Sequence, residues 1–213
     1  MTRWYPMMVD LANRPVLVVG GGPVAVPKIR GLIEAGARVK VVAPSIVPEV
    51  ETWHRSGVVD AERREFRPDD LDGVFYAVAA GPREVNQQVF EAAEERAVLV
   101  NAVDDPERCT VILPSVHRDG DLLVAVSTGG KAPALAVRLR QRVGSVLGDG
   151  YGPLLDFLAG FRDQVASRFS TFEERRRVWY RIVDSEVLEV LRSDGTERAA
   201  ELVSAILAEE GTR

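Results

Sequence analysis

Short apolar runs alternate, over the first half of the chain, with segments in which apolar residues recur every three or four positions. The runs have the β-branched composition of strands buried on both faces: Val16–Val19, Arg38–Ala43, Val74–Ala80 and Val98–Asn101, with the more amphipathic Val58–Phe66 near an edge. The helical spacing occurs between them, over Val24–Ala35, Pro48–Ser56 and Glu84–Arg96. This alternation predicts an α/β fold, a Rossmann-like doubly wound parallel sheet.

The pattern changes near residue 113. Apolar runs at Thr110–His117 and Leu122–Ser127 flank a polar turn and predict a hairpin, which does not continue a parallel series. A helical pattern follows over Ala134–Leu147. Further helical patterns occupy Pro153–Phe169, Thr171–Val183, Ser185–Leu191 and Thr196–Glu209. We therefore predict a Rossmann domain at residues 1–113, a small α+β region of hairpin plus helix at 114–149, and a C-terminal helical domain at 150–213.

The turn after the first strand carries the first candidate chemistry. Gly20, Gly22 and Ala25 fit the dinucleotide fingerprint, in which the first glycine allows a tight turn and the second lets the backbone approach a pyrophosphate. The following helix offers its N-terminal N–H groups, and Pro23 suits a first helical turn. A glycine turn also occurs for packing reasons alone. No carboxylate follows the second strand, which ends in Ala43-Pro44-Ser45, so the pattern does not distinguish NAD from NADP.

Ligands of open α/β sheets bind beyond the carboxyl ends of the strands. Ala80-Gly81 follows the fourth strand and is small enough for a dinucleotide to lie against it. Asn101-Ala102-Val103-Asp104 follows the fifth strand, and Asp104 is our candidate acid/base. The equally compatible alternative is that Asp104 and Asp105 shape a turn before Pro106.

Composition and charge narrow the class of ligand. The chain has 213 residues and a net charge of −5, which argues against non-specific binding to nucleic acid. It has no apolar run of membrane-spanning length and no basic leader, so we expect a cytoplasmic protein without membrane contact. One cysteine and two histidines make no zinc cluster. Residues 131–181 hold ten Lys or Arg against five acids, which fits a polyanionic small ligand or a solvated helical face.

Within that basic region, a second glycine-rich turn precedes a helix. Thr128-Gly129-Gly130-Lys131 could bind an anion through its backbone N–H groups, with Lys131 as a point charge. A purely structural turn is the alternative.

The motifs occur together in one order: Gly20-Gly21-Gly22-x-Val24-Ala25, Asn101-x-Val103-Asp104, Ser127-Thr128-Gly129-Gly130-Lys131-x-Pro133 and Arg175-Arg176-Arg177-x-Trp179. In this the chain resembles the precorrin-2 dehydrogenase/sirohydrochlorin ferrochelatase family of siroheme biosynthesis, in what looks like its stand-alone form. The resemblance implies NAD⁺-dependent oxidation of precorrin-2 to sirohydrochlorin and, in bifunctional members, insertion of Fe²⁺. It also implies a homodimer formed through residues 114–149.

The resemblance and the strand-end positions together give the predicted site. Asp104 is the candidate catalytic residue and also a candidate metal contact. The cofactor-binding candidates are Gly20, Gly21, Gly22, Pro23, Val24, Ala43, Pro44, Ala80, Gly81, Asn101 and Val103. The candidates for binding the tetrapyrrole substrate are Ser127, Thr128, Gly129, Lys131 and Arg138. Thr128 stands where some relatives carry a regulatory serine, so regulation at this position is not implied.

Two other functions fit a Rossmann core. A different small dehydrogenase would need a proton relay such as Tyr-x-x-x-Lys, which the chain lacks. A nucleotide-sensing regulatory module without catalysis predicts a ribose-binding acid after the second strand, and none stands there.

Overall fold

A computed structural model describes residues 4–211, so the outermost predicted boundaries, at residues 1 and 213, lie outside the described residues. The chain forms two compact units, Met1–Leu113 and Pro114–Arg213. How the second unit subdivides stays a prediction.

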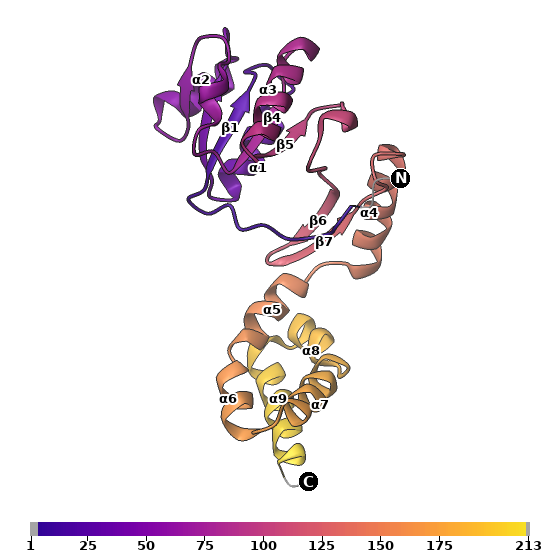
Figure 1. Cartoon of the computed structure of the whole chain (residues 1–213). Helices are drawn as coiled ribbons and strands as arrows, with labels where there is room; N and C mark the ends of the chain where they lie inside the picture. The colour runs from indigo at the N-terminus through magenta and orange to yellow at the C-terminus, as the bar shows by residue number, and fades with distance from the viewer. Residues whose placement is uncertain (1–3, 212–213) are drawn as a thin grey trace. The chain divides into compact units, whose positions relative to one another are not determined.

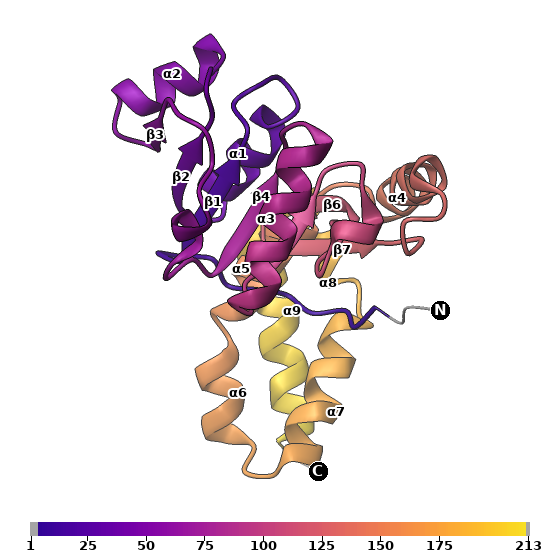
Figure 2. The same ribbon diagram turned by 45° about the horizontal axis from the view of Figure 1, so that its top comes forward.

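The first unit is built on a parallel sheet in the order β3-β2-β1-β4-β5. Figure 1 labels β1, β4 and β5, and Figure 2 labels β3, β2, β1 and β4. Its strands are β1 Pro15–Val19, β2 Arg38–Val42, β3 Asp60–Glu62, β4 Tyr76–Ala79 and β5 Leu99–Ala102. Its helices are α1 Val26–Glu34, α2 Pro48–Arg55 and α3 Arg83–Glu95, with short 3₁₀ turns η1 Pro68–Leu71 and η2 Pro106–Arg108. The predicted Rossmann-like fold is confirmed, and the order of strands reverses between β1 and β4.

Both faces of the sheet are covered, as the uniformly apolar strands require. Alternate side chains of β1 point to opposite faces: Val16 and Val18 pack with α1 and α2, whereas Leu17 and Val19 pack with α3. Each of these four residues is buried. The sheet is therefore a rigid central layer, and its carboxyl edge holds the loops that follow β1, β4 and β5.

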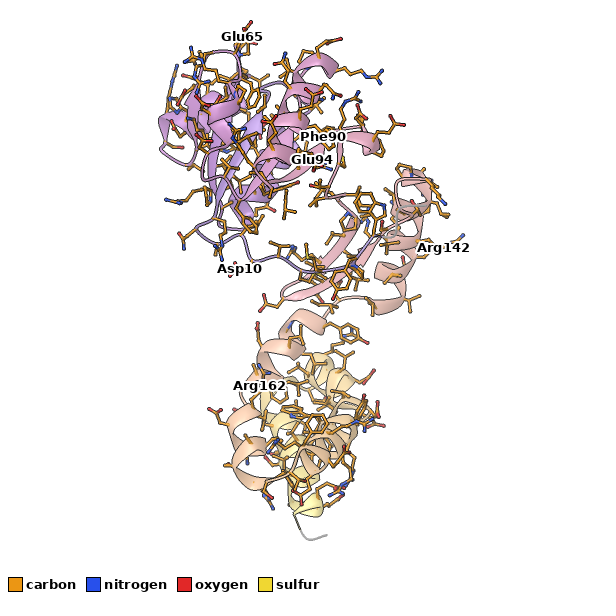
Figure 3. The ribbon with its side chains drawn as sticks, in the orientation of Figure 1. Asp10, Glu65, Phe90, Glu94, Arg142 and Arg162 are labelled. Atoms are coloured by element: carbon orange, nitrogen blue, oxygen red, sulfur yellow. The ribbon has the colours of Figure 1, made fainter. Side chains whose placement is uncertain are left out.

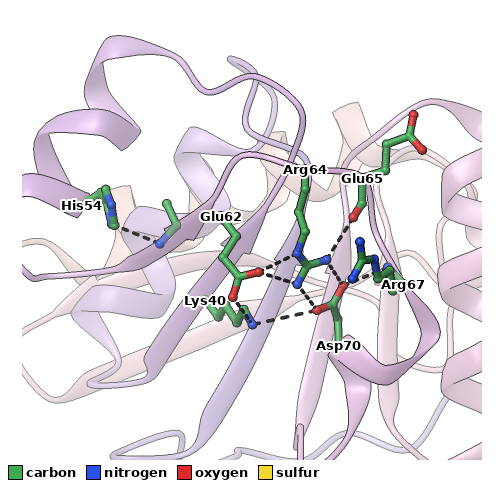
Figure 4. Close-up of polar contacts among 8 residues, drawn as sticks. Lys40, His54, Glu62, Arg64, Glu65, Arg67 and Asp70 are labelled. Carbon is green, nitrogen blue, oxygen red and sulfur yellow. Dashed lines mark hydrogen bonds and ion pairs between the residues drawn. The ribbon is translucent and has the colours of Figure 1, made fainter.

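The third strand is shorter than predicted, three residues instead of the nine of Val58–Phe66. The Arg64 N–H donates to the Glu62 carbonyl, which turns the chain away from β2. The Arg64 guanidinium then binds the carboxylates of Glu62 and Asp70, with N–O distances of 2.5 Å (Figure 4). Lys40 of β2 binds Glu62 at 2.7 Å. Polar side chains thus end the strand and join β2, β3 and η1.

The second unit begins with an antiparallel hairpin, β6 Ser115–Asp119 and β7 Leu122–Val126, followed by α4 Pro133–Leu147. The first hairpin strand begins five residues later than predicted, because Thr110 and Val111 donate their backbone N–H groups to Val100 of β5. Gly144 of α4 lies against the imidazole of His117, where an added Cβ would stand 2.9 Å from Nδ1. The helix can approach the hairpin because this residue has no side chain.

Helices fill the rest of the second unit: α5 Tyr151–Ala159, α6 Arg162–Arg168, α7 Phe172–Val183, α8 Val187–Ser193 and α9 Gly195–Glu210 (Figure 2). The pattern over residues 153–169 predicted one helix, but the chain breaks at Gly160-Phe161 and forms α5 and α6. Thr171 caps α7 through a capping box with Glu174. None of the helices within residues 4–211 has the length and apolar content needed to cross a bilayer.

Candidate functional site

The three glycines after β1 differ in what surrounds them. Gly20 has φ +122°, and an added Cβ would lie 2.5 Å from the Ala80 carbonyl oxygen. A Cβ on Gly21 would lie 2.6 Å from Ile46 Cγ2. Both are therefore glycines because neighbouring loops of the protein pass close by. A Cβ on Gly22 would meet no atom within 4 Å, so this position faces open space. Gly22 is where a pyrophosphate could approach the backbone, and the turn fits a dinucleotide.

Helix α1 begins two residues later than predicted. Ala25 is its N-cap, the Ala25 N–H donates to the Gly22 carbonyl at 3.0 Å, and the proline of the first turn is Pro27. The expectation that Pro23 occupies the first helical turn is therefore wrong. Pro23 and Val24 lie in the exposed turn before the helix, beside Gly22. They stay candidates for contact with a cofactor.

The loop after β4 is held by a residue that the sequence analysis missed. Asn86 of α3 is buried, and its Oδ1 accepts a hydrogen bond from the Gly81 N–H at 2.9 Å. The Ala80 N–H donates to the Val19 carbonyl at 2.8 Å. The two N–H groups of Ala80-Gly81 are thus used inside the protein. The signal in the sequence was a polar residue on the apolar face of a predicted helix.

The end of β5 is ordered by contacts with the segment that follows it. The predicted cofactor contact Asn101 is buried, and its Nδ2 donates to the Val111 carbonyl at 2.9 Å. The Cys109 thiol, whose pKa is raised by burial, accepts a hydrogen bond from the Ala102 N–H at 3.2 Å. The side-chain amide of Asn101 therefore holds the carboxyl end of β5 to the segment that follows it. Val103 is half-buried, and its N–H donates to the Ala79 carbonyl at 2.9 Å.

Asp104 is exposed and lies directly beyond this edge. Its φ of +58° puts it in the left-handed region, which aspartate tolerates better than most residues. An open pocket of about 390 Å³ lies here, lined by Gly81, Arg83, Asn86, Val103, Asp104 and Asp105. The loops after β4 and β5 thus meet in one pocket, and Asp104 lies in it.

The two aspartates of this pocket have different surroundings. Asp105 forms an ion pair with Arg108, which also donates to Gln87. Asp104 makes no hydrogen bond or ion pair with any residue in the range 4–211. Both residues belong to the turn, but only the Asp105 side chain is bound within it. The Asp104 carboxylate is available to a ligand.

The end of β2 offers no charged contact. Ala43 is buried and its N–H donates to the Glu62 carbonyl at 3.2 Å, while Pro44 is exposed. The nearby carboxylates of Glu62 and Asp70 bind Lys40 and Arg64. Ala43 and Pro44 can thus contribute only apolar contacts and backbone groups to a cofactor.

The predicted substrate-binding residues all lie in the second unit, whereas the Asp104 pocket belongs to the first. The Ser127 hydroxyl accepts from the Gly129 N–H at 3.1 Å, and the Thr128 hydroxyl accepts from the Ala132 N–H at 3.2 Å. These hydroxyls therefore shape the loop. Lys131 is exposed, and Arg138 donates to Gln141 at 3.1 Å.

The other basic side chains of this unit differ in whether a carboxylate of the protein already binds them. Arg142 of α4 is exposed (Figure 3). Arg177 and Arg181 of α7, in contrast, bind the buried carboxylate of Glu210, each at 2.7 Å. Part of the local basic surplus is thus neutralised within the helical region.

Within residues 4–211, no group of three or more His, Cys, Asp or Glu side chains is placed so that it could hold a metal ion.

Three family models match successive parts of the chain. A model described as putative NAD(P)-binding matches residues 7–115, a little over half of the chain. One described as sirohaem biosynthesis protein central matches residues 119–145, and one described as sirohaem synthase dimerisation region matches residues 150–207. That last description puts the dimerisation region later than the predicted residues 114–149.

Individual proteins with siroheme-related names are also similar to this chain. Siroheme synthase 1 of Aeromonas salmonicida is 40% identical over 209 residues, which is 97% of this chain and 45% of the relative. Siroheme synthase of Nitrosomonas europaea is 38% identical over 96% of this chain and 43% of its own length. The chain thus spans less than half of these relatives. A solved structure of SirC, a precorrin-2 dehydrogenase, matches 95% of this chain and 100% of its own with a TM-score of 0.77 and 26% identity. The chain therefore belongs to the NAD(P)-binding family of siroheme biosynthesis that includes these siroheme synthases and this precorrin-2 dehydrogenase.

Proposed function

We propose that this chain oxidises precorrin-2 to sirohydrochlorin with NAD⁺, in the cytoplasm. The observation that carries the proposal is the unpaired Asp104 carboxylate, in a pocket beyond β4 and β5 of a dinucleotide-binding sheet. The similarity to SirC, which is named a precorrin-2 dehydrogenase and matched over its whole length, supports it.

The cofactor would be held at the point where the strand order reverses. Gly22 leaves room for the pyrophosphate beside the N-terminus of α1, whose dipole favours a negative charge there. Pro23, Val24, Ala80, Gly81 and Val103 are the proposed further contacts. NAD⁺, when bound, supplies the acceptor for the hydride.

Asp104 is the proposed proton acceptor. The oxidation removes two electrons and two hydrogens from the tetrapyrrole, one as a hydride and one as a proton. A carboxylate without an internal partner can take up that proton and pass it to solvent, because Asp104 is exposed. Arg108 holds Asp105 in an ion pair, so the carboxylate of Asp105 does not compete with that of Asp104 for the proton.

The name siroheme synthase, carried by longer relatives, favours a second candidate step: insertion of Fe²⁺ into sirohydrochlorin. Fe²⁺ would enter as a substrate. The same Asp104 carboxylate would accept the protons that leave the pyrrole nitrogens as the metal enters.

An anaerobic assay with enzymatically generated precorrin-2 tests the proposal, comparing NAD⁺ with NADP⁺ and following sirohydrochlorin by absorbance. The decisive variant is Asp104→Asn, since asparagine tolerates a positive φ and alanine would add backbone strain. We expect turnover to fall by about two to four orders of magnitude, the usual contribution of a general base, while the Kd for NAD⁺ stays unchanged. Asp69→Asn, at an exposed position outside the pocket, serves as the matched control.

Full turnover by Asp104→Asn would remove this residue from the chemistry. No oxidation by the wild-type chain with either cofactor would contradict the proposed reaction, and nucleotide binding without reaction would favour the sensing module. Adding Fe²⁺ after oxidation tests the second step, against the rate of metal insertion without protein.

A further inference from the structure

We propose that Arg83 binds a carboxylate of the tetrapyrrole at the Asp104 pocket and so determines substrate affinity. This inference rests on the proposed function and adds a residue that neither the sequence analysis nor the similarity pointed to. Arg83 is the first residue of α3, directly after the β4 loop.

The first observation is that Arg83 is available. It is exposed and lines the pocket together with Asp104, and its side chain makes no hydrogen bond or ion pair within residues 4–211. Other arginines of the same unit bind carboxylates of the protein: Arg30, Arg55, Arg63, Arg64, Arg96 and Arg108. A guanidinium left unpaired in a concave site is suited to an external oxyanion, which its planar fork can bind through two hydrogen bonds.

The second observation is the balance of charge in the pocket. Asp104 and Asp105 both line it, and two carboxylates would repel a substrate that carries eight of its own. Arg108 neutralises Asp105 by an ion pair. Arg83 supplies the positive charge that offsets Asp104. The polyanion can then approach the carboxylate of Asp104.

The place of the pocket in the sheet favours the substrate over the cofactor as the bound anion. The pyrophosphate is expected at Gly22 and the start of α1, which follow β1. Arg83 and Asp104 follow β4 and β5, and the strand order puts both strands on the side of β1 away from β2. A phosphate on Gly22 and a carboxylate on Arg83 would occupy successive parts of the same edge.

The test compares the wild-type chain with Arg83→Gln, Arg83→Lys and the control Arg55→Gln. The control removes the same charge from the exposed face of α2, where the side chain is 77% exposed. We expect Arg83→Gln to raise the KM for precorrin-2 about tenfold or more, as for loss of a charged hydrogen bond. The kcat should stay within about threefold and the Kd for NAD⁺ should not change. Arg83→Lys should rescue only part of the affinity, because lysine lacks the fork.

A KM for precorrin-2 that is the same in Arg83→Gln and wild type would overturn the inference. A weaker Kd for NAD⁺ with unchanged tetrapyrrole binding would also overturn it and assign Arg83 to the cofactor. Fluorescence titration with uroporphyrin, an octacarboxylate, separates this failure from that of the proposed function. If wild type binds uroporphyrin through Arg83 but oxidises nothing, the inference holds and the reaction fails.

Discussion

At the scale of single residues, the glycine turn shows that neighbouring identical residues can be required for different reasons. Gly20 is fixed by its φ of +122° and by the nearby Ala80 carbonyl, both of which belong to the folded protein itself. Gly22 has no such neighbour, and its lack of a side chain leaves space outside the protein. Gly20 is therefore required by the fold itself, whereas Gly22 is the proposed point of approach for the cofactor.

Alanine at each position separates the two roles. Gly20→Ala should lower the free energy of unfolding by about 1–3 kcal/mol or more, because backbone strain and a steric clash act together. Gly22→Ala should leave stability within about 0.5 kcal/mol of wild type but weaken NAD⁺ binding, since the new Cβ occupies the approach of the pyrophosphate. Urea unfolding and titration with NAD⁺ measure the two effects. Unchanged NAD⁺ affinity in Gly22→Ala would mean that the cofactor does not approach there.

At the scale of elements, ion pairs as well as backbone hydrogen bonds hold β3, at the edge of the sheet, to β2 and η1. Asp70 of η1 has a side chain that is 6% exposed, and it binds Arg64 through both oxygens and accepts from the Arg67 N–H at 2.9 Å (Figure 4). Burial alone would raise the pKa of Asp70, but these hydrogen bonds and the positive charges of Arg64 and Lys40 lower it below its ordinary value of 3.8. The ion pairs of Arg64 thus add contacts at this edge, where the short β3 forms few backbone hydrogen bonds.

This lowered pKa predicts a stability that depends on pH. The folded chain binds a proton at Asp70 less readily than the unfolded chain, so the stabilisation is present above about pH 4 and is lost as pH falls. At pH 7, Asp70→Asn should lower the free energy of unfolding by about 1–3 kcal/mol. The difference from wild type should shrink below pH 4. Asp69→Asn is the control, since Asp69 is 89% exposed and should change little. An Asp70→Asn effect that is constant from pH 7 to pH 3 would contradict the electrostatic account.

At the scale of the whole molecule, the second unit exposes apolar side chains on two separate segments. Leu135, Leu139 and Val146 share one face of α4 and are 51%, 37% and 86% exposed. Phe172 and Tyr180 of α7 are 69% and 56% exposed. No strand residue of the β6–β7 hairpin is fully buried, and two-stranded hairpins are marginal alone. We propose a homodimer through residues 114–149, whereas the family description names residues 150–207.

One charged substitution in each segment distinguishes the two assignments. Leu135→Glu should convert the dimer into a monomer, because burying an unpaired carboxylate in an apolar interface is costly. Phe172→Glu should leave the dimer intact, as should the control Val58→Glu at an exposed apolar position of the first unit. Sedimentation or light scattering reads the mass directly. A monomer only in Phe172→Glu would move the interface to residues 150–207, and a monomeric wild type would contradict the dimer.

The sequence by itself determined the features that local patterns encode. Uniformly apolar runs such as Val16–Val19 can only be buried on both faces, so the parallel sheet and its carboxyl edge were predictable. The glycine turn and Asp104 became candidates because each lies in the loop that follows such a strand. Errors at this level were small, such as the start of α1, because the ends of helices depend on a single turn of hydrogen bonds.

Tertiary structure alone decided which partner each polar side chain finds. Arg108 is held across the fold by Gln87 of α3 and pairs with Asp105, which leaves the Asp104 side chain without a partner among residues 4–211. Asn86 and Arg83 join the site because α3 begins where β4 ends beside β5. Ser127 and Thr128 use their hydroxyls on their own loop. Which of several nearby groups a polar side chain binds depends on the folded backbone, and a pattern along the chain does not contain that choice.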